Sequence, residues 1–112
     1  MNINAADFGD TEIIYVEGEI AGANIVELQR AVESLKNSSY RRICIELSKA
    51  TYINSQGLGG LIYLHKVISK HGKELIILSP SNVVRSLIRT CCFDTLFTVG
   101  ETACITKSIA KS

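Results

Sequence analysis

One serine in this chain lies where its hydroxyl can do chemistry. Ser55 ends a β-type run and directly precedes an apolar helical pattern, within the segment Tyr52-Ile53-Asn54-Ser55-Gln56-Gly57-Leu58-Gly59-Gly60-Leu61. A serine at such a junction has its hydroxyl at the helix N-cap, among main-chain amides that the helix leaves unpaired. This kind of corner is exposed and electropositive, so it suits a phosphate group. Ser55 is therefore either a helix cap or an acceptor for a regulatory phosphate.

The neighbours that a hydrolytic serine needs are missing around Ser55. A nucleophile elbow has glycine two residues before the serine, where this chain has Ile53. His65 follows along the same predicted helix, about 15 Å from the corner at 1.5 Å per residue. His71 is farther still. Neither imidazole can accept the serine proton in a hydrogen bond, and the sequence argues against serine hydrolysis.

The glycines after Ser55 do not form a nucleotide-binding loop. The run Gly57-Leu58-Gly59-Gly60 is neither G-x-G-x-x-G nor followed by Gly-Lys-Ser/Thr. Since paired catalytic carboxylates are also missing, we expect no enzyme activity and no cofactor. Gly59 and Gly60 each cost roughly 1 kcal/mol relative to alanine inside a helix. Their presence predicts close packing of the helix on a sheet, close approach of a partner protein, or both.

Composition and length indicate one ordinary globular domain over residues 1–112, because 46% of the residues are apolar and only one is proline. The longest apolar run is far shorter than the ~20 residues of a membrane span, and no N-terminal signal pattern is visible. We expect a cytoplasmic protein without a membrane partner. The four cysteines form no C-x-x-C pair, which predicts buried reduced thiols and no metal site.

Charge is unevenly distributed although the net charge is only +1. Residues 1–40 hold seven acidic and two basic side chains, and residues 41–112 hold four acidic and ten basic ones, so the balances of −5 and +6 sum to +1. Such asymmetry is typical of a partner-facing surface. The longest basic cluster is Arg41-Arg42, which does not indicate a nucleic-acid partner.

Hydrophobic periodicity predicts strands that alternate with helices. The strands are expected at 3–8, 12–20, 42–47, 74–78 and 96–99, and the helices at 24–37, 56–70, 79–91 and 102–110. This order predicts an α/β domain with a mostly parallel or mixed sheet of four to five strands and about four helices. Leu58, Leu61, Ile62 and Ile68 form an inward helical stripe, with His65 as a half-buried packing residue beside it.

Capping residues refine the expected helix ends. Asn24 followed by Glu27 resembles a capping box. Gly72 is suited to a left-handed C-terminal cap, and Ser79-Pro80 reads as an N-cap followed by proline at the first helical position.

Several segments in register resemble the STAS domain of bacterial anti-sigma factor antagonists. They cover nearly the whole chain and are Val16-Glu17-Gly18-Glu19-Ile20, Ile43-Cys44-Ile45-Glu46-Leu47, Ile53-Asn54-Ser55-Gln56-Gly57-Leu58-Gly59, and residues 83–97 with their ending Phe93-Asp94-Thr95-Leu96-Phe97. The resemblance implies a single STAS-like domain and a protein that regulates transcription by switching partners.

In that family, the unphosphorylated antagonist binds an anti-sigma factor that is also a serine kinase, and so releases a sigma factor. The kinase phosphorylates a serine at this corner, and a phosphatase removes the phosphate. The resemblance places the phosphate on Ser55. It implies a partner-binding surface made of Ala21, Asn54, Ser55, Gln56, Gly57, Leu58 and Gly59.

Two positions depart from the family pattern. The serine usually follows an aspartate where this chain has Asn54, and an aspartate often ends the strand before the first helix where this chain has Ala21. Loss of the carboxylate beside Ser55 keeps a second interpretation open. In that interpretation the domain is a constitutive scaffold or accessory subunit, in a stress-signalling assembly or a lipid-transport complex, without control by phosphorylation.

Overall fold

The predicted α/β architecture is confirmed by a computed structural model that describes residues 2–110. Its elements in chain order are β1 (Asn2–Phe8), β2 (Thr11–Ile20), α1 (Ala23–Glu33), β3 (Arg42–Ile53), α2 (Ser55–Lys70), β4 (Glu74–Leu78), α3 (Asn82–Thr90), β5 (Thr98–Gly100) and α4 (Thr102–Ala110). They form one five-stranded sheet in the order β1-β2-β3-β4-β5. The hairpin of β1 and β2 is antiparallel, and every later pair is parallel.

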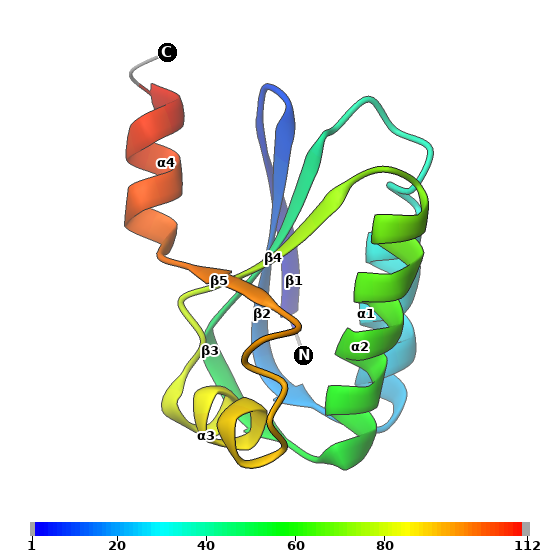
Figure 1. Ribbon diagram of the computed structural model, residues 1–112, viewed down its shortest axis with the longest axis vertical. Coiled ribbons are helices and arrows are strands. Elements are labelled where there is room, and N and C mark those ends of the chain that lie inside the picture. Colours follow the sequence, from blue (N-terminus) through cyan, green and yellow to red (C-terminus); the bar gives the residue numbers. More distant parts are fainter. Residues whose placement is uncertain (1, 111–112) are drawn as a thin grey trace.

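The helices lie on different sides of the sheet. Figure 1 shows α1 and α2 side by side on one face, α3 near the strand end from which α2 starts, and α4 apart on the opposite side. The face under α1 and α2 carries the main core, which includes Ile14, Ile45 and Ile77. The other face has a smaller apolar cluster of Ile13, Cys44, Ile76 and Leu78, against which Ile105 of α4 packs.

Strand β3 is longer than predicted and carries the chain to the Ser55 corner without a loop. The sequence predicted a strand that ends at Leu47, but residues 48–53 continue it. Ala50 lies opposite Gly18 of β2, and Ile53 lies opposite Ile20. The register between the two strands shifts twice, near Glu17 and again after Gly18. This long pairing brings the ends of β2 and β3 to the same edge of the sheet.

Of the three caps predicted away from the Ser55 corner, one agrees with the structure. Gly72 has a φ of 74°, and the amides of Gly72 and Lys73 donate to the carbonyls of Ser69 and Ile68, which is the predicted left-handed cap in its Schellman form. The capping box at Asn24 is wrong, because Gly22 is the N-cap of α1 and makes no side-chain capping bond.

The third cap was also predicted wrongly. Helix α3 starts after Ser81, two residues later than expected. Ser79 instead adopts a left-handed backbone with a φ of 46°, and Pro80 lies before the helix.

The expectation of buried thiols holds for one cysteine. Cys44 is buried in the sheet, whereas Cys91, Cys92 and Cys104 are exposed, and all four are free. The helix predicted at 79–91 ends at Thr90, and Cys91 is its C-cap. The position therefore lies past the last residue of the helical stripe.

Candidate functional site

Asn54 is the residue that caps helix α2. Its backbone is extended, and its Oδ1 accepts a hydrogen bond from the amide of Gly57 at 2.9 Å. The carbonyl of Asn54 accepts from the amide of Leu58 at 2.9 Å. The prediction that Ser55 is the N-cap is wrong by one residue. Because asparagine is as good an N-cap as serine, the sequence at this corner was ambiguous.

Because Asn54 caps α2, the helix does not need the Ser55 hydroxyl as its N-cap. Ser55 is the first residue of α2 and is exposed. The amides of the first helical turn have no intrahelical partner, and Asn54 satisfies only that of Gly57. An exposed hydroxyl thus lies at the positive end of the helix dipole, where negative charge is favoured.

Gly57 fixes this corner against the end of β2. A Cβ at position 57 would lie 2.0 Å from the carbonyl oxygen of Ile20, so the first turn of α2 touches the main chain of β2. Ile20 and Ile53 are also register partners in the two strands. As a result, half-buried Ala21, directly after β2, lies beside the corner that holds Ser55.

Gly59 and Gly60, both inside α2, differ in whether internal packing requires a glycine. A Cβ at Gly60 would lie 2.8 Å from Cγ2 of Ile25, so Gly60 permits close packing of α2 on α1. The predicted close packing is confirmed at Gly60, but Gly60 packs on helix α1 rather than on the sheet. A Cβ at Gly59 would meet nothing within 4 Å, and Gly59 is exposed. Internal packing therefore does not explain Gly59.

The predicted partner-binding residues divide into surface and core positions. Ser55, Gln56 and Gly59 are exposed, and Asn54 and Ala21 are half-buried. The side chain of Leu58 is only 3% exposed and belongs to the core with Leu61 and Ile68. Gly57 is buried as well. These last two residues shape the corner by packing and are not available to a partner.

Exposed apolar side chains near Gly59 were missed in the sequence. Tyr63 is 45% exposed and follows Gly59 by one helical turn, which places both on one face of α2. Val26 on the neighbouring α1 is 48% exposed. The neighbouring carboxylate of Glu33 on α1 raises the pKa of the Tyr63 hydroxyl. The spacing of four residues from Gly59 was the one sequence signal for Tyr63.

His65 has the packing role that was predicted. Its ring contacts that of Phe97 edge to face, with ring centroids 5.9 Å apart. It is half-buried and lies on the inner side of α2, far along the helix from Ser55.

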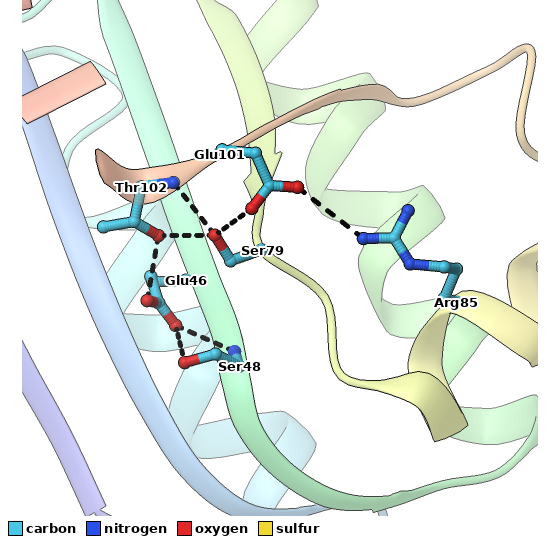
Figure 2. Close-up of polar contacts among 6 residues, drawn as sticks. All are labelled: Glu46, Ser48, Ser79, Arg85, Glu101 and Thr102. Carbon is cyan, nitrogen blue, oxygen red and sulfur yellow. Dashed lines mark hydrogen bonds and ion pairs between the residues drawn. The ribbon is translucent and has the colours of Figure 1, made fainter. Parts of the chain in front are cut away.

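A polar cluster at the other side of the sheet anchors helix α4 (Figure 2). Oε1 of Glu46 accepts from the amide and the hydroxyl of Ser48, both at 2.8 Å. The Thr102 hydroxyl lies 2.9 Å from Oε2 of Glu46 and from the Ser79 hydroxyl. Ser79 Oγ also accepts from the amide of Thr102 and donates to Glu101.

The cluster explains why Ser79 does not cap α3. Its hydroxyl caps α4 instead, through the amide of the first α4 residue, Thr102. An ion pair between Arg85 of α3 and Glu101, at 3.8 Å, completes the group (Figure 2). Apart from the Glu46–Ser48 bonds, which lie within β3, its polar contacts link different segments of the chain, so we read the cluster as structural.

No group of three or more His, Cys, Asp or Glu side chains within residues 2–110 has the arrangement of a metal site. The longest helices of this same range are too short or too polar to cross a bilayer.

Known proteins resemble this chain in sequence and in fold. The family model of the STAS domain matches residues 2–103. The anti-sigma-B factor antagonist of Staphylococcus aureus (strain NCTC 8325 / PS 47) is 27% identical over 88 residues, which cover 79% of this chain and 82% of that protein.

Solved structures agree on the fold. An anti-sigma factor antagonist from Mycobacterium paratuberculosis superposes with a TM-score of 0.81 at 19% identity, over 99% of this chain and 94% of that one. The antagonist SpoIIAA in its unphosphorylated form gives 0.79 at 12% identity, over 99% and 98%. The phosphorylated form of SpoIIAA from Bacillus gives 0.74 at 12% identity, over 96% and 99%.

Proposed function

This chain belongs to the STAS domain family, and from that premise we propose that it is an anti-sigma factor antagonist. The Staphylococcus aureus relative bears that name. The observation that carries the proposal is the Ser55 corner. Ser55 is exposed at the start of α2 beside Ala21, and the helix is capped by Asn54 rather than by the Ser55 hydroxyl. The proposed surface for the anti-sigma factor consists of Ala21, Asn54, Ser55, Gln56 and Gly59.

Phosphorylation of Ser55 is the proposed switch. The unphosphorylated chain binds an anti-sigma factor that is a serine kinase, that kinase phosphorylates Ser55, and a phosphatase reverses the reaction. SpoIIAA, which shares the fold, has been solved in both phosphorylation states. In this scheme the chain itself is not an enzyme, needs no cofactor and acts in the bacterial cytoplasm.

The physics of the corner supports a switch that leaves the fold intact. A phosphate adds roughly −1.5 to −2 charge. At the first turn of a helix this charge is tolerated or stabilising, by about 0.3–1 kcal/mol when exposed. Within a docked interface, an unpaired charge costs several kcal/mol. The same phosphate therefore weakens binding while the free domain stays folded.

The test compares Ser55→Asp with Ser55→Ala in binding to the kinase-type anti-sigma factor. We expect Ser55→Asp to bind at least tenfold more weakly, equivalent to about 1.4 kcal/mol, with an unchanged circular dichroism spectrum. Ser39→Asp is the matched control, because Ser39 is exposed in the loop after α1 and adds the same charge away from the corner. Equal affinities of the two Ser55 variants contradict the switch.

Asn54 favours a second candidate function, that of a constitutive STAS scaffold or accessory subunit. Its amide keeps the capping bond to Gly57 but brings no negative charge beside Ser55. Incubation with the cognate kinase and ATP, followed by mass spectrometry, separates the candidates. Stoichiometric phosphate on Ser55 contradicts the scaffold. Phosphate on Asn54→Asp but not on the natural chain favours it.

A further inference from the structure

A polar pocket of about 600 Å³ lies at the end of the sheet opposite the Ser55 corner. Its walls come from the start of β3, the start of β4 and the last turns of α2, and include Arg41, Arg42, His65, Ser69, Lys73 and Thr98. Ser55 and Ser69 lie at opposite ends of α2, which separates them by about 21 Å at 1.5 Å per residue. The pocket is therefore distinct from the proposed partner surface.

Positive charge dominates the pocket wall. The lining holds three basic residues, Arg41, Arg42 and Lys73, and one acidic residue, Glu74. The Asp10 carboxylate lies close by, because it accepts from the Thr11 hydroxyl that Arg42 also approaches. Within the described residues, none of the three basic side chains forms an ion pair. The ion pair found there joins Arg85 to Glu101. Arginine side chains offer several N–H donors in a planar fork that matches phosphate oxygens. Among the described residues, Arg41 and Lys73 would thus offer an anion charges outside any ion pair, whereas Arg42 has Glu74 as its register partner on β4.

Neutral groups contact these basic residues, and they fix the ammonium group of Lys73. The ammonium group of Lys73 donates to the main-chain carbonyls of Ser38 and Tyr40, which fix its position without cancelling its charge. A guanidinium nitrogen of Arg42 lies 3.5 Å from the hydroxyl of Thr11. The main chain of Arg41 bonds to that of Asp10 and of Glu74. Such preorganisation lowers the ordering cost of ligand binding.

Uncharged polar groups complete the wall. The hydroxyl-bearing residues Ser69 and Thr98 are exposed where they line the pocket. His65 lines it too, and its Nδ1 is shielded from solvent without a hydrogen-bond partner in the described part of the chain. Buried polar atoms are normally satisfied in folded proteins, so the unpaired Nδ1 makes His65 an unusual residue of this wall.

We propose that this pocket binds a small phosphate ester that carries two or more negative charges. The volume suits a small metabolite, because ligand pockets typically measure about 300–1,000 Å³. The excess of basic over acidic residues favours an anion, and the forked donors of the two arginines favour phosphate oxygens. Nothing in this inference depends on phosphorylation of Ser55, so either proposal can fail alone.

The test uses the full chain labelled with ¹⁵N and titrated with inorganic pyrophosphate at constant ionic strength. We expect saturable shifts of the amide signals of Arg41, Arg42, Gly72, Lys73 and Thr98. Arg41→Gln combined with Arg42→Gln should weaken binding about tenfold or more, because charge-assisted hydrogen bonds to phosphate are lost. The matched control is Arg30→Gln with Lys49→Gln, which removes two exposed charges outside this pocket and should change affinity less than about twofold.

A second variant keeps the test decisive if the arginine pair fails to fold. Ser69→Glu leaves both arginines in place and adds a carboxylate at an exposed position on the pocket wall, and we expect it to abolish the shifts. The absence of saturable shifts in the natural chain overturns the proposal, and so does an equal loss in the control pair. Tighter binding of a single-stranded oligonucleotide at the same residues also overturns it, in favour of a nucleic-acid partner.

Discussion

A Cβ at Gly57 would lie 2.0 Å from the carbonyl oxygen of Ile20. Because the obstacle is main chain, no side chain can move aside, and α2 must shift away from β2 to make room. We expect Gly57→Ala to lower the free energy of unfolding by about 1–3 kcal/mol, the usual cost of overpacking. Urea denaturation of the two proteins measures the difference. An unchanged stability would mean that the first turn of α2 does not touch β2.

For Gly59, two residues after Gly57, we expect substitution by alanine to stabilise the protein rather than to destabilise it. Since a Cβ there meets nothing within 4 Å, Gly59→Ala should raise the free energy of unfolding by up to about 1 kcal/mol, the difference in helix propensity. If the proposed partner approaches this helix closely, the same variant should bind the anti-sigma factor more weakly. Urea denaturation and a binding titration on one sample separate the two effects. A loss of stability would instead reveal a packing contact at this position.

Asn54 can be tested for capping independently of any partner. Asn54→Ala removes the acceptor for the amide of Gly57 and should cost about 1 kcal/mol of stability, with a range of 0.5–2 kcal/mol. Asn54→Asp keeps the acceptor and places a charge at the positive end of α2, so its stability should equal or exceed that of the natural chain. Thermal denaturation of both variants checks the order. Equal stability of Asn54→Ala and the natural chain would argue against the cap.

The sequence predicted the order of elements well because periodicity reports which face of each element is buried. The strand predicted at 74–78 and the helix at 102–110 match β4 and α4. Prediction failed where one element depends on another. The apolar strand pattern ends at Leu47, yet Ser48 to Ile53 stay in β3 because β2 supplies a register partner as far as Ile53.

At the candidate site, too, local features could be predicted from the sequence, and contacts between elements could not. Ser55 could be singled out from a strand-to-helix junction, but the choice between Asn54 and Ser55 as the cap depended on one hydrogen bond to Gly57. Gly57 is required because the carbonyl of Ile20, in a strand more than thirty residues earlier, leaves no room for a Cβ. No local sequence pattern reveals such a contact.

The four cysteines should differ sharply in reactivity. Burial raises the pKa of the Cys44 thiol to about 11, against a smaller opposing effect from Arg42. Alkylation requires the thiolate, so at pH 8 the fraction of reactive Cys44 is very small in the folded protein. We expect iodoacetamide to modify Cys91, Cys92 and Cys104, which are exposed, and to leave Cys44 free until urea is added. Peptide mass spectrometry identifies each site, and rapid modification of Cys44 in the native protein would contradict its burial.

Ser79 combines an unfavourable backbone with favourable side-chain bonds, and two substitutions separate them. Ser79→Ala loses the hydroxyl that accepts from the Thr102 amide and donates to Glu101, and it keeps a Cβ at a φ of 46°. Ser79→Gly loses the same bonds but relieves the left-handed backbone, which costs about 1–2 kcal/mol for a residue with a Cβ. We therefore expect Ser79→Ala to be the less stable variant, by about 1 kcal/mol. Urea denaturation gives the order, and faster hydrogen exchange of the Thr102 amide in both variants reports the lost cap of α4. If exchange at Thr102 is unchanged, Ser79 does not hold the start of that helix.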